Sequence, residues 1–489
     1  MRYFFGCILL GFVLRLFSLS PVFAAYAAME REPIKIEISE VDESTFAGLT
    51  DRDYNTFFHF DEGEINVIPE RPAFVLYIVW NEPPNEYSVI ADEKETVIND
   101  GFLHKLVVFS ERAEKVVINT GGGSICDIFL FDGRDNLPEY VQDWREPCEQ
   151  ADMMVFSAHA DDELLMFGGT LPYYAKELDL RVQVVYMTTH WQEQPRPHEA
   201  LDGLWEAGVE NYPVFGIIPD IPYQPIFTLA EAAELYDFEE VSEWFTEQLR
   251  RFKPSVLITH DLKGEYGHAA HKLAAKTASE AVELSSDPSA YPDSAEKYGI
   301  WDVPKTYLHF YEENTVEMDW EIPLESYGGI TAKEAAAQCY KKHKSQQIWG
   351  YSVNYGDKWD CRQFGLYRSL VGTDTKADFM EHIFPISDIR DSEETAENTT
   401  VEPILTAPQQ EEKTADSMEA ILEDKASAKT DSTVSKHEKS TSETTAEESQ
   451  ENVEIKIPPA APEKEKIIIG TAIVLTAAII LVIIIKHRR

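Results

Sequence analysis

Short apolar segments rich in β-branched and aromatic residues fill the first third of the chain, and polar turns such as "TGGGS" separate them. Several such runs in close succession indicate an all-β sandwich, and no helical period competes with that pattern. We therefore expect a β-sandwich domain over residues 28–148. Its clearest strands are expected at 74–80 ("FVLYIVW"), 105–110 ("KLVVFS"), 115–120 ("KVVINT") and 125–131 ("ICDIFLF").

The pattern changes at Met153, where apolar strands begin to alternate with amphipathic helical stretches. Uninterrupted apolar strands that alternate with helices predict a parallel sheet with both faces covered. The fold class expected over residues 149–385 is therefore α/β, a Rossmann-like parallel sheet with helices on both faces. The expected strands are 153–158, 181–189, 212–218, 254–260 and 305–311, and the expected helices are 163–178, 196–208, 229–252, 269–284 and 331–349.

Both ends of the chain carry targeting patterns. Residues 1–27 combine a basic start, an apolar run and small residues spaced for cleavage, which predicts a signal peptide, with an uncleaved anchor as the alternative. Residues 386–466 are polar and acidic and predict a disordered stalk. Residues 467–485 are uncharged and long enough for one transmembrane helix, with a buried soluble helix as the alternative. The basic tail 486–489 would be cytoplasmic, which places the folded domains outside in an exported, single-pass protein.

Charge and cysteine content limit the function classes further. The net charge of −44, from 43 basic and 87 acidic side chains, argues against nucleic acid as a partner. Four cysteines remain after signal removal, and an even number in an exported chain suggests disulfides. Sequence proximity alone favours the pairs Cys126–Cys148 and Cys339–Cys361, and four free thiols are the alternative. No cysteine spacing suggests a metal site.

Polar side chains gather after two of the expected strands. His159, Asp161 and Asp162 follow "MMVFSA", and "GHAAH" brings His268 and His271 after "SVLIT". The carboxyl ends of strands form the sites of such sheets. A nitrogen from each motif plus a carboxylate would make a three-ligand zinc site with an open fourth position. The alternatives are a carboxylate that caps the next helix and a histidine pair on a solvated face.

These motifs resemble those of the LmbE-like, PIG-L-type de-N-acetylases. "AHADDELLMFGGTL" is similar to the first signature of that family, and "GEYGHAAH" is similar to its second. The segment "RPHEALDGLWEAGVENYPVFGIIPD" resembles the helix and strand between them, and "KKHKSQQ", with Ser345 and Gln346, resembles a later stretch. The resemblance covers most of residues 150–350. This chain departs from the family at Ala160, where proline is usual, and at Ala269 and Ala270, where proline and aspartate are usual. None of these positions is one of the implied metal ligands.

The resemblance implies a site and a reaction. His159, Asp162 and His271 would hold one Zn²⁺, and Asp161 would be the general base on water. His268 would donate to the oxyanion or protonate the departing amine.

Three further residues receive weaker assignments. Tyr266 would assist beside His268 as a catalytic residue. Arg196 and Asp220 would grip sugar hydroxyls, and the alternatives are a surface salt bridge for Arg196 and a turn residue for Asp220. His190 and His198 are expected in loops, and His260 has no assigned role.

The expected function is zinc-dependent hydrolysis of the N-acetyl amide of an N-acetylglucosamine-type sugar on an extracellular glycan or glycoconjugate. The alternatives are a zinc amidase that acts on a different amide and a surface carbohydrate-binding adhesin with a degenerate enzyme domain. The segment "LTDRDYNTFFHFDEGEINV" resembles the ligand loop of discoidin-type sandwiches, with Arg52 in place of a glycine. That loop suggests glycan attachment by the β-sandwich, and a structural spacer is the alternative.

Overall fold

The computed structural model describes residues 30–386 except residue 40, residues 221–225 and residues 357–358. The expected signal peptide, stalk beyond Ile386, membrane span and tail lie outside the described residues, so they stay predictions. Within the described part, no helix is long and apolar enough to cross a membrane.

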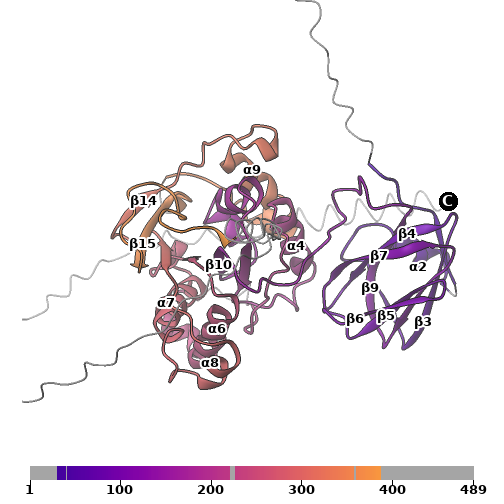
Figure 1. Cartoon of the computed structure of the whole chain (residues 1–489), viewed down its shortest axis with the longest axis horizontal. Coiled ribbons are helices and arrows are strands. Elements are labelled where there is room, and N and C mark those ends of the chain that lie inside the picture. Colours follow the sequence, from indigo (N-terminus) through magenta and orange to yellow (C-terminus); the bar gives the residue numbers. More distant parts are fainter. Residues whose placement is uncertain (1–29, 40, 221–225, 357–358, 387–489) are drawn as a thin grey trace, which may run out of the picture. The chain divides into compact units, whose positions relative to one another are not determined.

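Two antiparallel sheets make up the N-terminal part, and the expected strands lie within them (Figure 1). The short helix α2 (Glu43–Gly48) precedes the second sheet and begins at Asp42, whose carboxylate accepts from the backbone N–H of Ser44 and Thr45. The first sheet has the order β1 (Ile36–Ile38), β3 (Gly63–Pro69), β8 (Val116–Thr120), β5 (Tyr87–Ala91) and β6 (Lys94–Ile98). The second has the order β2 (Phe58–Phe60), β9 (Gly123–Phe131), β4 (Ala73–Trp80) and β7 (His104–Ala113).

Side-chain alternation along β4 explains how the sandwich is packed. Leu76, Ile78 and Trp80 point into the core that the two sheets share. The intervening Val75 and Val79 belong to a second cluster on the outer face of the same sheet. Period-two alternation with apolar residues on both faces means that this sheet is covered on both sides.

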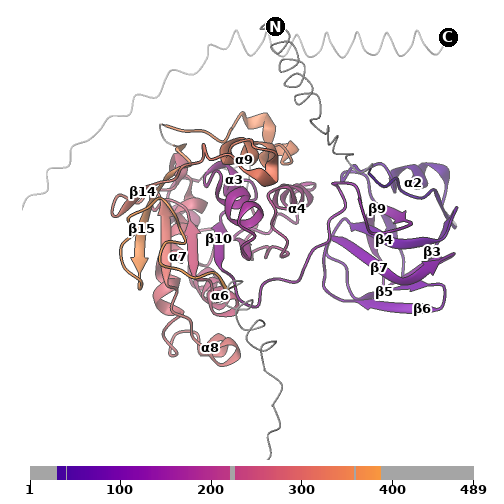
Figure 2. The same cartoon turned by 45° about the horizontal axis from the view of Figure 1, so that its top comes forward.

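The C-terminal part is built on one six-stranded sheet (Figure 2). Its order is β11 (Val182–Tyr186), β10 (Met153–Ser157), β12 (Val256–Thr259), β13 (Lys305–His309), β15 (Gln363–Ser369) and β14 (Thr315–Glu317). The first four strands are parallel, but β15 runs antiparallel to both β13 and β14. The expected parallel sheet is therefore found in four strands, and the two additional strands make the sheet mixed. The strand expected at 212–218 contributes only isolated bridges at Val214 and Ile218.

Helices cover both faces of this sheet, as the alternating pattern predicted. Met153 and Val155 of β10 pack with one set of helices, and Met154 and Phe156 pack with the other. The first set contains α3 (Asp162–Leu165), α4 (Arg196–Glu206) and α9 (Ala332–Tyr340). The second contains α6 (Phe238–Phe252) and α7 (Ala269–Leu284), with the shorter α5 (Leu229–Ala232) and α8 (Pro292–Tyr298) nearby.

Two expected helices are interrupted. The stretch 163–178 breaks at Gly168, which has φ +55°, and continues as a π-helical turn from Pro172 to Glu177. The stretch 229–252 divides into α5 and α6, and the carboxylate of Asp237 caps the start of α6. Both interruptions follow from residues that favour turns and caps over helix interiors.

The four cysteines expected to pair are buried free thiols, so the predicted disulfides are wrong. Cys126 lies in the outer cluster of the sandwich, whereas Cys148 packs with the helices of the mixed sheet. Sequence proximity did not pair Cys126 with Cys148, because the chain crosses from one core cluster to another between them, whereas Cys339 and Cys361 belong to one cluster and are still free thiols. Burial raises the pKa of all four thiols, to about 12 for Cys148, Cys339 and Cys361.

Candidate active site

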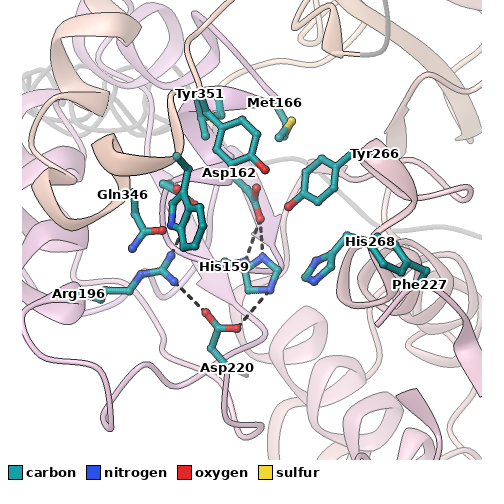
Figure 3. A pocket seen from close by; sticks show the side chains of 13 residues that line it. His159, Asp162, Met166, Arg196, Asp220, Phe227, Tyr266, His268, Gln346 and Tyr351 are labelled. Carbon is teal, nitrogen blue, oxygen red and sulfur yellow. Dashed lines mark hydrogen bonds and ion pairs between the residues drawn. The ribbon is translucent and has the colours of Figure 1, made fainter. Parts of the chain in front are cut away.

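The polar residues that follow β10 and β12 meet at one cavity of about 460 Å³ (Figure 3). Parallel strands bring their carboxyl ends to the same edge of the sheet, which explains why these distant motifs meet. Seven of the eight predicted site residues line the cavity: His159, Asp161, Asp162, Arg196, Asp220, Tyr266 and His268. The eighth, His271, is fully buried and contacts Asp162 from below the cavity lining.

Asp162 is the centre of the predicted metal site. Its Oδ2 lies 2.9 Å from Nδ1 of His159 and 3.1 Å from Nε2 of His271. Three ring nitrogens, one from each of His159, His268 and His271, also lie within 4.8 Å of one another, which is close enough to share an ion. Burial opposes charge on Asp162, but His271 and His159 hold the pKa of its carboxyl well below the usual value. Two imidazoles and an ionised carboxylate fit the preferences of zinc.

His260 also lies close to Asp162, but its hydrogen bonds exclude it from that site. The backbone N–H of Ala158 donates to its Nε2 at 2.9 Å, which uses the ring lone pair. Its other nitrogen, Nδ1, lies 2.9 Å from Glu265 and therefore carries the proton. A histidine can bind a metal only through an unprotonated nitrogen, so His260 holds the β10 loop instead.

Glu265 connects three histidines beneath the cavity. Its two carboxylate oxygens lie 2.9 Å from His260, 2.7 Å from His271 and 2.7 Å from His309. Burial disfavours the charge, but the three imidazoles hold the pKa of Glu265 well below its usual value. The motifs assigned no role to Glu265. The available signal was its position within "GEYGHAAH", three residues before His268.

The contact with Glu265 also fixes the orientation of His271. Because Nδ1 of His271 donates to Glu265, Nε2 faces Asp162 and the proposed ion. Burial alone would lower the pKa of His271, but Asp162 and Glu265 raise it to about 10. A buried imidazole between two carboxylates needs a positive charge on it or beside it, and a divalent metal bound there would supply that charge.

Asp161 is held apart from Asp162 by an unusual backbone. Its φ is +117°, and its side chain makes no capping hydrogen bond to α3, so the helix-cap alternative is wrong. Burial raises the pKa of Asp161 to about 7, although Arg196, 3.6 Å away, opposes that shift. A carboxylate of this pKa beside a group of side chains that could hold a metal is suited to accept and return a proton near neutral pH.

His268 is a neutral imidazole at the cavity wall. Burial, with His159 and His271 nearby, lowers its pKa to about 2. Its Nδ1 has no hydrogen-bond partner among the described residues. A neutral ring can still donate through N–H, so the donor role fits this geometry and the role of a charged acid does not. Tyr266 stacks against the ring of His268, and its hydroxyl lies 3.4 Å from Nε2 of His271.

Arg196 and Asp220 form a buried pair on the opposite wall. Arg196 Nη1 lies 2.8 Å from Asp220, and Nη2 donates to the carbonyl of Ala160 at 2.6 Å. The other oxygen of Asp220 lies 3.7 Å from Nε2 of His159. Arg196 therefore does not form a surface salt bridge, because both side chains are buried. Asp220 is more than a turn residue, because its carboxylate pairs with Arg196. His198, expected in a loop, lies in α4.

Several lining residues have no counterpart among the predicted site residues. Trp349 and Tyr351 are partly exposed, and Gln346, which the sequence placed only in a motif, lines the cavity with them. Aromatic faces beside polar groups are typical of carbohydrate and small-molecule sites. The remaining lining residues are Leu165, Met166 and Phe227.

Comparison with known proteins agrees with the motifs. Residues 154–282 match the family described as "PIG-L: GlcNAc-PI de-N-acetylase". These residues form a PIG-L domain. The resemblance stated from the motifs is thereby confirmed, and the domain contains both signatures and the residues between them.

Relatives of the PIG-L domain carry deacetylase names. A 1D-myo-inositol 2-acetamido-2-deoxy-alpha-D-glucopyranoside deacetylase 1 of Catenulispora acidiphila is 26% identical over 179 residues, which are 32% of this chain and 54% of that protein. The deacetylase of the same substrate from Streptomyces scabiei is 27% identical, with the same shares. The chain thus spans about half the length of these relatives. Among solved structures, N,N'-diacetylchitobiose deacetylase from Pyrococcus horikoshii matches 50% of this chain and 92% of its own, at 18% identity and TM-score 0.33.

Proposed function

We propose that the PIG-L domain hydrolyses the N-acetyl amide of an N-acetylated amino sugar and releases acetate. The observation that carries this proposal is the position of Asp161, with a pKa near 7, beside the cluster of His159, Asp162 and His271 in one cavity. The names of the two bacterial relatives, both deacetylases of a 2-acetamido-2-deoxy-glucopyranoside, support the substrate class.

We propose that His159, Asp162 and His271 hold one divalent metal, zinc being the best match to two imidazoles and a carboxylate. A metal bound there would polarise the amide carbonyl and make water more acidic. Asp161 accepts the proton of the attacking water. His268 donates its N–H to the oxyanion that develops on the carbonyl. Asp161 then returns the proton to the departing amine, which leaves acetate and a free amino sugar.

Arg196 and Asp220 serve in substrate positioning in this account. Both are buried, and Asp220 lies between Arg196 and His159 at the cavity wall. A guanidinium and a carboxylate held together offer a donor and an acceptor to neighbouring sugar hydroxyls. Tyr351 and Trp349 add aromatic surface at the cavity, on which the apolar face of a sugar ring can pack.

We further propose that the protein is exported and anchored by residues 467–485, with its folded domains outside. The support is the sequence pattern at the two ends, with an apolar uncharged stretch followed by basic residues. Mass spectrometry of the mature protein tests the first step, because a cleaved signal gives a chain that begins after Ala24 or Ala27. A mature chain that begins at Met1 would contradict cleavage.

The purified full-length protein provides the direct test of activity. We would measure bound metal and then acetate released from a panel of N-acetylated glycans and glycoconjugates. About one metal per chain, with acetate release from at least one sugar, supports the proposal. Bound metal without acetate from any sugar favours an amidase of another substrate. Glycan binding without bound metal would favour the adhesin alternative, although the site residues that an adhesin could lose are all present.

A further inference from the structure

A second cavity, of about 320 Å³, lies between the β-sandwich and the PIG-L domain. One side is the sandwich loop 51–55, which is part of the segment that resembles a discoidin-type ligand loop. The other side comes from α4 and the turn that follows α9. The residues that matter are Arg52, Asp53, Asn55, Glu199, Lys344 and Ser345. The volume is at the lower end of the range for small-ligand sites.

The sandwich loop is fixed in place by contacts to α4. The hydroxyl of Tyr54 donates to Asp202 at 3.0 Å, and the ring of Tyr54 stacks on His198 with centroids 4.4 Å apart. The backbone N–H of Arg52 donates to the buried carboxylate of Asp127 at 3.0 Å. These contacts fix Tyr54 and the backbone of Arg52, while the side chains of Arg52, Asp53 and Asn55 stay exposed to solvent at the cavity.

This cavity and the active-site cavity share a wall. Pro195 and Ser345 line the second cavity, whereas their direct neighbours Arg196 and Gln346 line the active site. Glu199 fastens the two segments together, since its carboxylate accepts from the backbone N–H of Ser345 at 2.8 Å and from its hydroxyl at 2.6 Å. Adjacent residues of two chain segments therefore line the two cavities, and the hydrogen bonds to Glu199 hold these segments together.

The polar groups of the second cavity are only partly used within the protein. Asp202 is satisfied by Tyr54 and Gln142. In contrast, neither Arg52 nor Lys344 forms a salt bridge with any carboxylate among the described residues. Asp53 uses one oxygen for Asn55. The guanidinium of Arg52 lies over the ring of Tyr140, 4.9 Å from its centroid, and its N–H groups make no side-chain hydrogen bond among the described residues. Cationic donors beside a carboxylate and an amide match a ligand rich in hydroxyl groups.

We propose that the second cavity is a saccharide subsite, which binds a sugar unit next to the one that is deacetylated. This inference rests on the proposed function and deepens it, because it makes the substrate an oligosaccharide or glycan. Arg52, Asp53 and Asn55 contact that unit from the sandwich, and Lys344 contacts it from the turn that follows α9. The sandwich therefore contributes to substrate selection and is more than a spacer.

The test compares kcat/KM for N-acetylglucosamine with kcat/KM for its β-1,4-linked di- and trisaccharides, using the full-length protein. The wild type should favour the longer substrates. Arg52→Ala and Lys344→Ala should each lower the ratio of longer to single-sugar kcat/KM by about tenfold, as expected for loss of one charged hydrogen bond. Lys341→Ala, at an exposed lysine that does not line the cavity, should keep the ratio. Equal kcat/KM for all lengths, or an unchanged ratio in both variants, would overturn the proposal.

A binding experiment separates failure of the subsite from failure of the proposed function. Titration of Asp161→Asn with the same three saccharides measures affinity without turnover. If Asp161→Asn binds the di- and trisaccharide more tightly than the single sugar, and the double variant Asp161→Asn/Arg52→Ala does not, the subsite is supported. This conclusion holds even if the wild type releases no acetate. Equal affinity for all three lengths would overturn the subsite even if the deacetylase activity is found.

Discussion

The carboxylate of Glu265 lies 2.7 Å from Nδ1 of His271, and neither side chain is open to solvent. This contact sets which nitrogen of His271 faces Asp162, and it also places a negative charge behind the proposed metal ligands. Carboxylates behind metal-bound histidines orient the ring and increase its basicity. Glu265 is therefore a positioning residue in this account and touches neither substrate nor metal.

Replacement of Glu265 by glutamine tests that role. Glu265→Gln keeps the size of the side chain but removes the charge and one of the two acceptors, so three histidines compete for a single carbonyl. We expect zinc affinity to fall about tenfold to a hundredfold, measured by competition with a chelator. Glu296→Gln, at an exposed position of α8, is the matched control. A Glu265→Gln protein that holds zinc as tightly as the wild type would contradict the assignment.

The glycine pair after α3 is expected to be intolerant of side chains. A Cβ on Gly169 would lie 2.7 Å from Cβ of Ala332 and 2.9 Å from the ring of Trp320. Gly169→Ala should therefore lower the free energy of unfolding by about 1–3 kcal/mol, measured by denaturant titration. Gly121→Ala meets no atom within 4 Å and serves as the control. Equal stability of the two variants would show that the interior here can rearrange without cost.

The thiols give an independent check on the fold. Cys126, Cys148, Cys339 and Cys361 are buried and free, and burial raises the pKa of each. A thiol reagent should therefore react slowly with the native protein and should modify all four after denaturation without reductant. Peptide mapping under the same conditions identifies each modified site. Recovery of a peptide pair joined by a disulfide would contradict the assignment of four free thiols.

Asp127 should make the stability of the sandwich depend on pH. Burial raises the pKa of Asp127 to about 7, from an ordinary value of 3.8, although the backbone N–H of Arg52 opposes the shift. Between about pH 4 and pH 7 the folded state therefore holds a proton that the unfolded state has lost. The free energy of unfolding should fall as pH rises through that window, by up to about 1.4 kcal/mol per pH unit.

Asp127→Asn should remove that component, since the amide oxygen can still accept from Arg52 and has no proton to lose. The measurement is the difference in denaturant stability between the variant and the wild type at pH 5 and at pH 7.5. The variant should gain relative stability at the higher pH. Asp61→Asn, at an exposed aspartate, should show no such difference. A pH-independent difference for Asp127→Asn would contradict the raised pKa.

The sequence predicted the parts of the fold that depend on local pattern. Continuous apolar runs located β4, β9 and β10, and the change of pattern at Met153 marked the start of the α/β part. The motif residues could be assigned to one site because the ends of parallel strands converge. The antiparallel β15 was missed because no helix follows it within the described residues, so the alternation of strand and helix does not reveal its place between β13 and β14.

The pattern of apolar and polar residues could not predict contacts between segments that are distant in the sequence. His309 looked like an ordinary part of an apolar strand, yet it meets Glu265 across the sheet. The sequence assigned no role to His260, whose Nε2 accepts a hydrogen bond from the backbone N–H of Ala158 in the structure. The prediction of a Cys126–Cys148 disulfide failed for the same reason, since proximity in sequence says little about which core a cysteine enters.

The most direct test of the central claim is kcat for acetate release by Asp161→Asn, measured with the zinc content of the same sample. Asparagine suits this position because it tolerates the positive φ of Asp161 better than most side chains. We predict a kcat at least about a hundredfold below the wild-type value with zinc content unchanged. Asp179→Asn, at an exposed aspartate that also has positive φ, should retain wild-type kcat. A wild-type kcat in Asp161→Asn would contradict the assignment of Asp161 as the base.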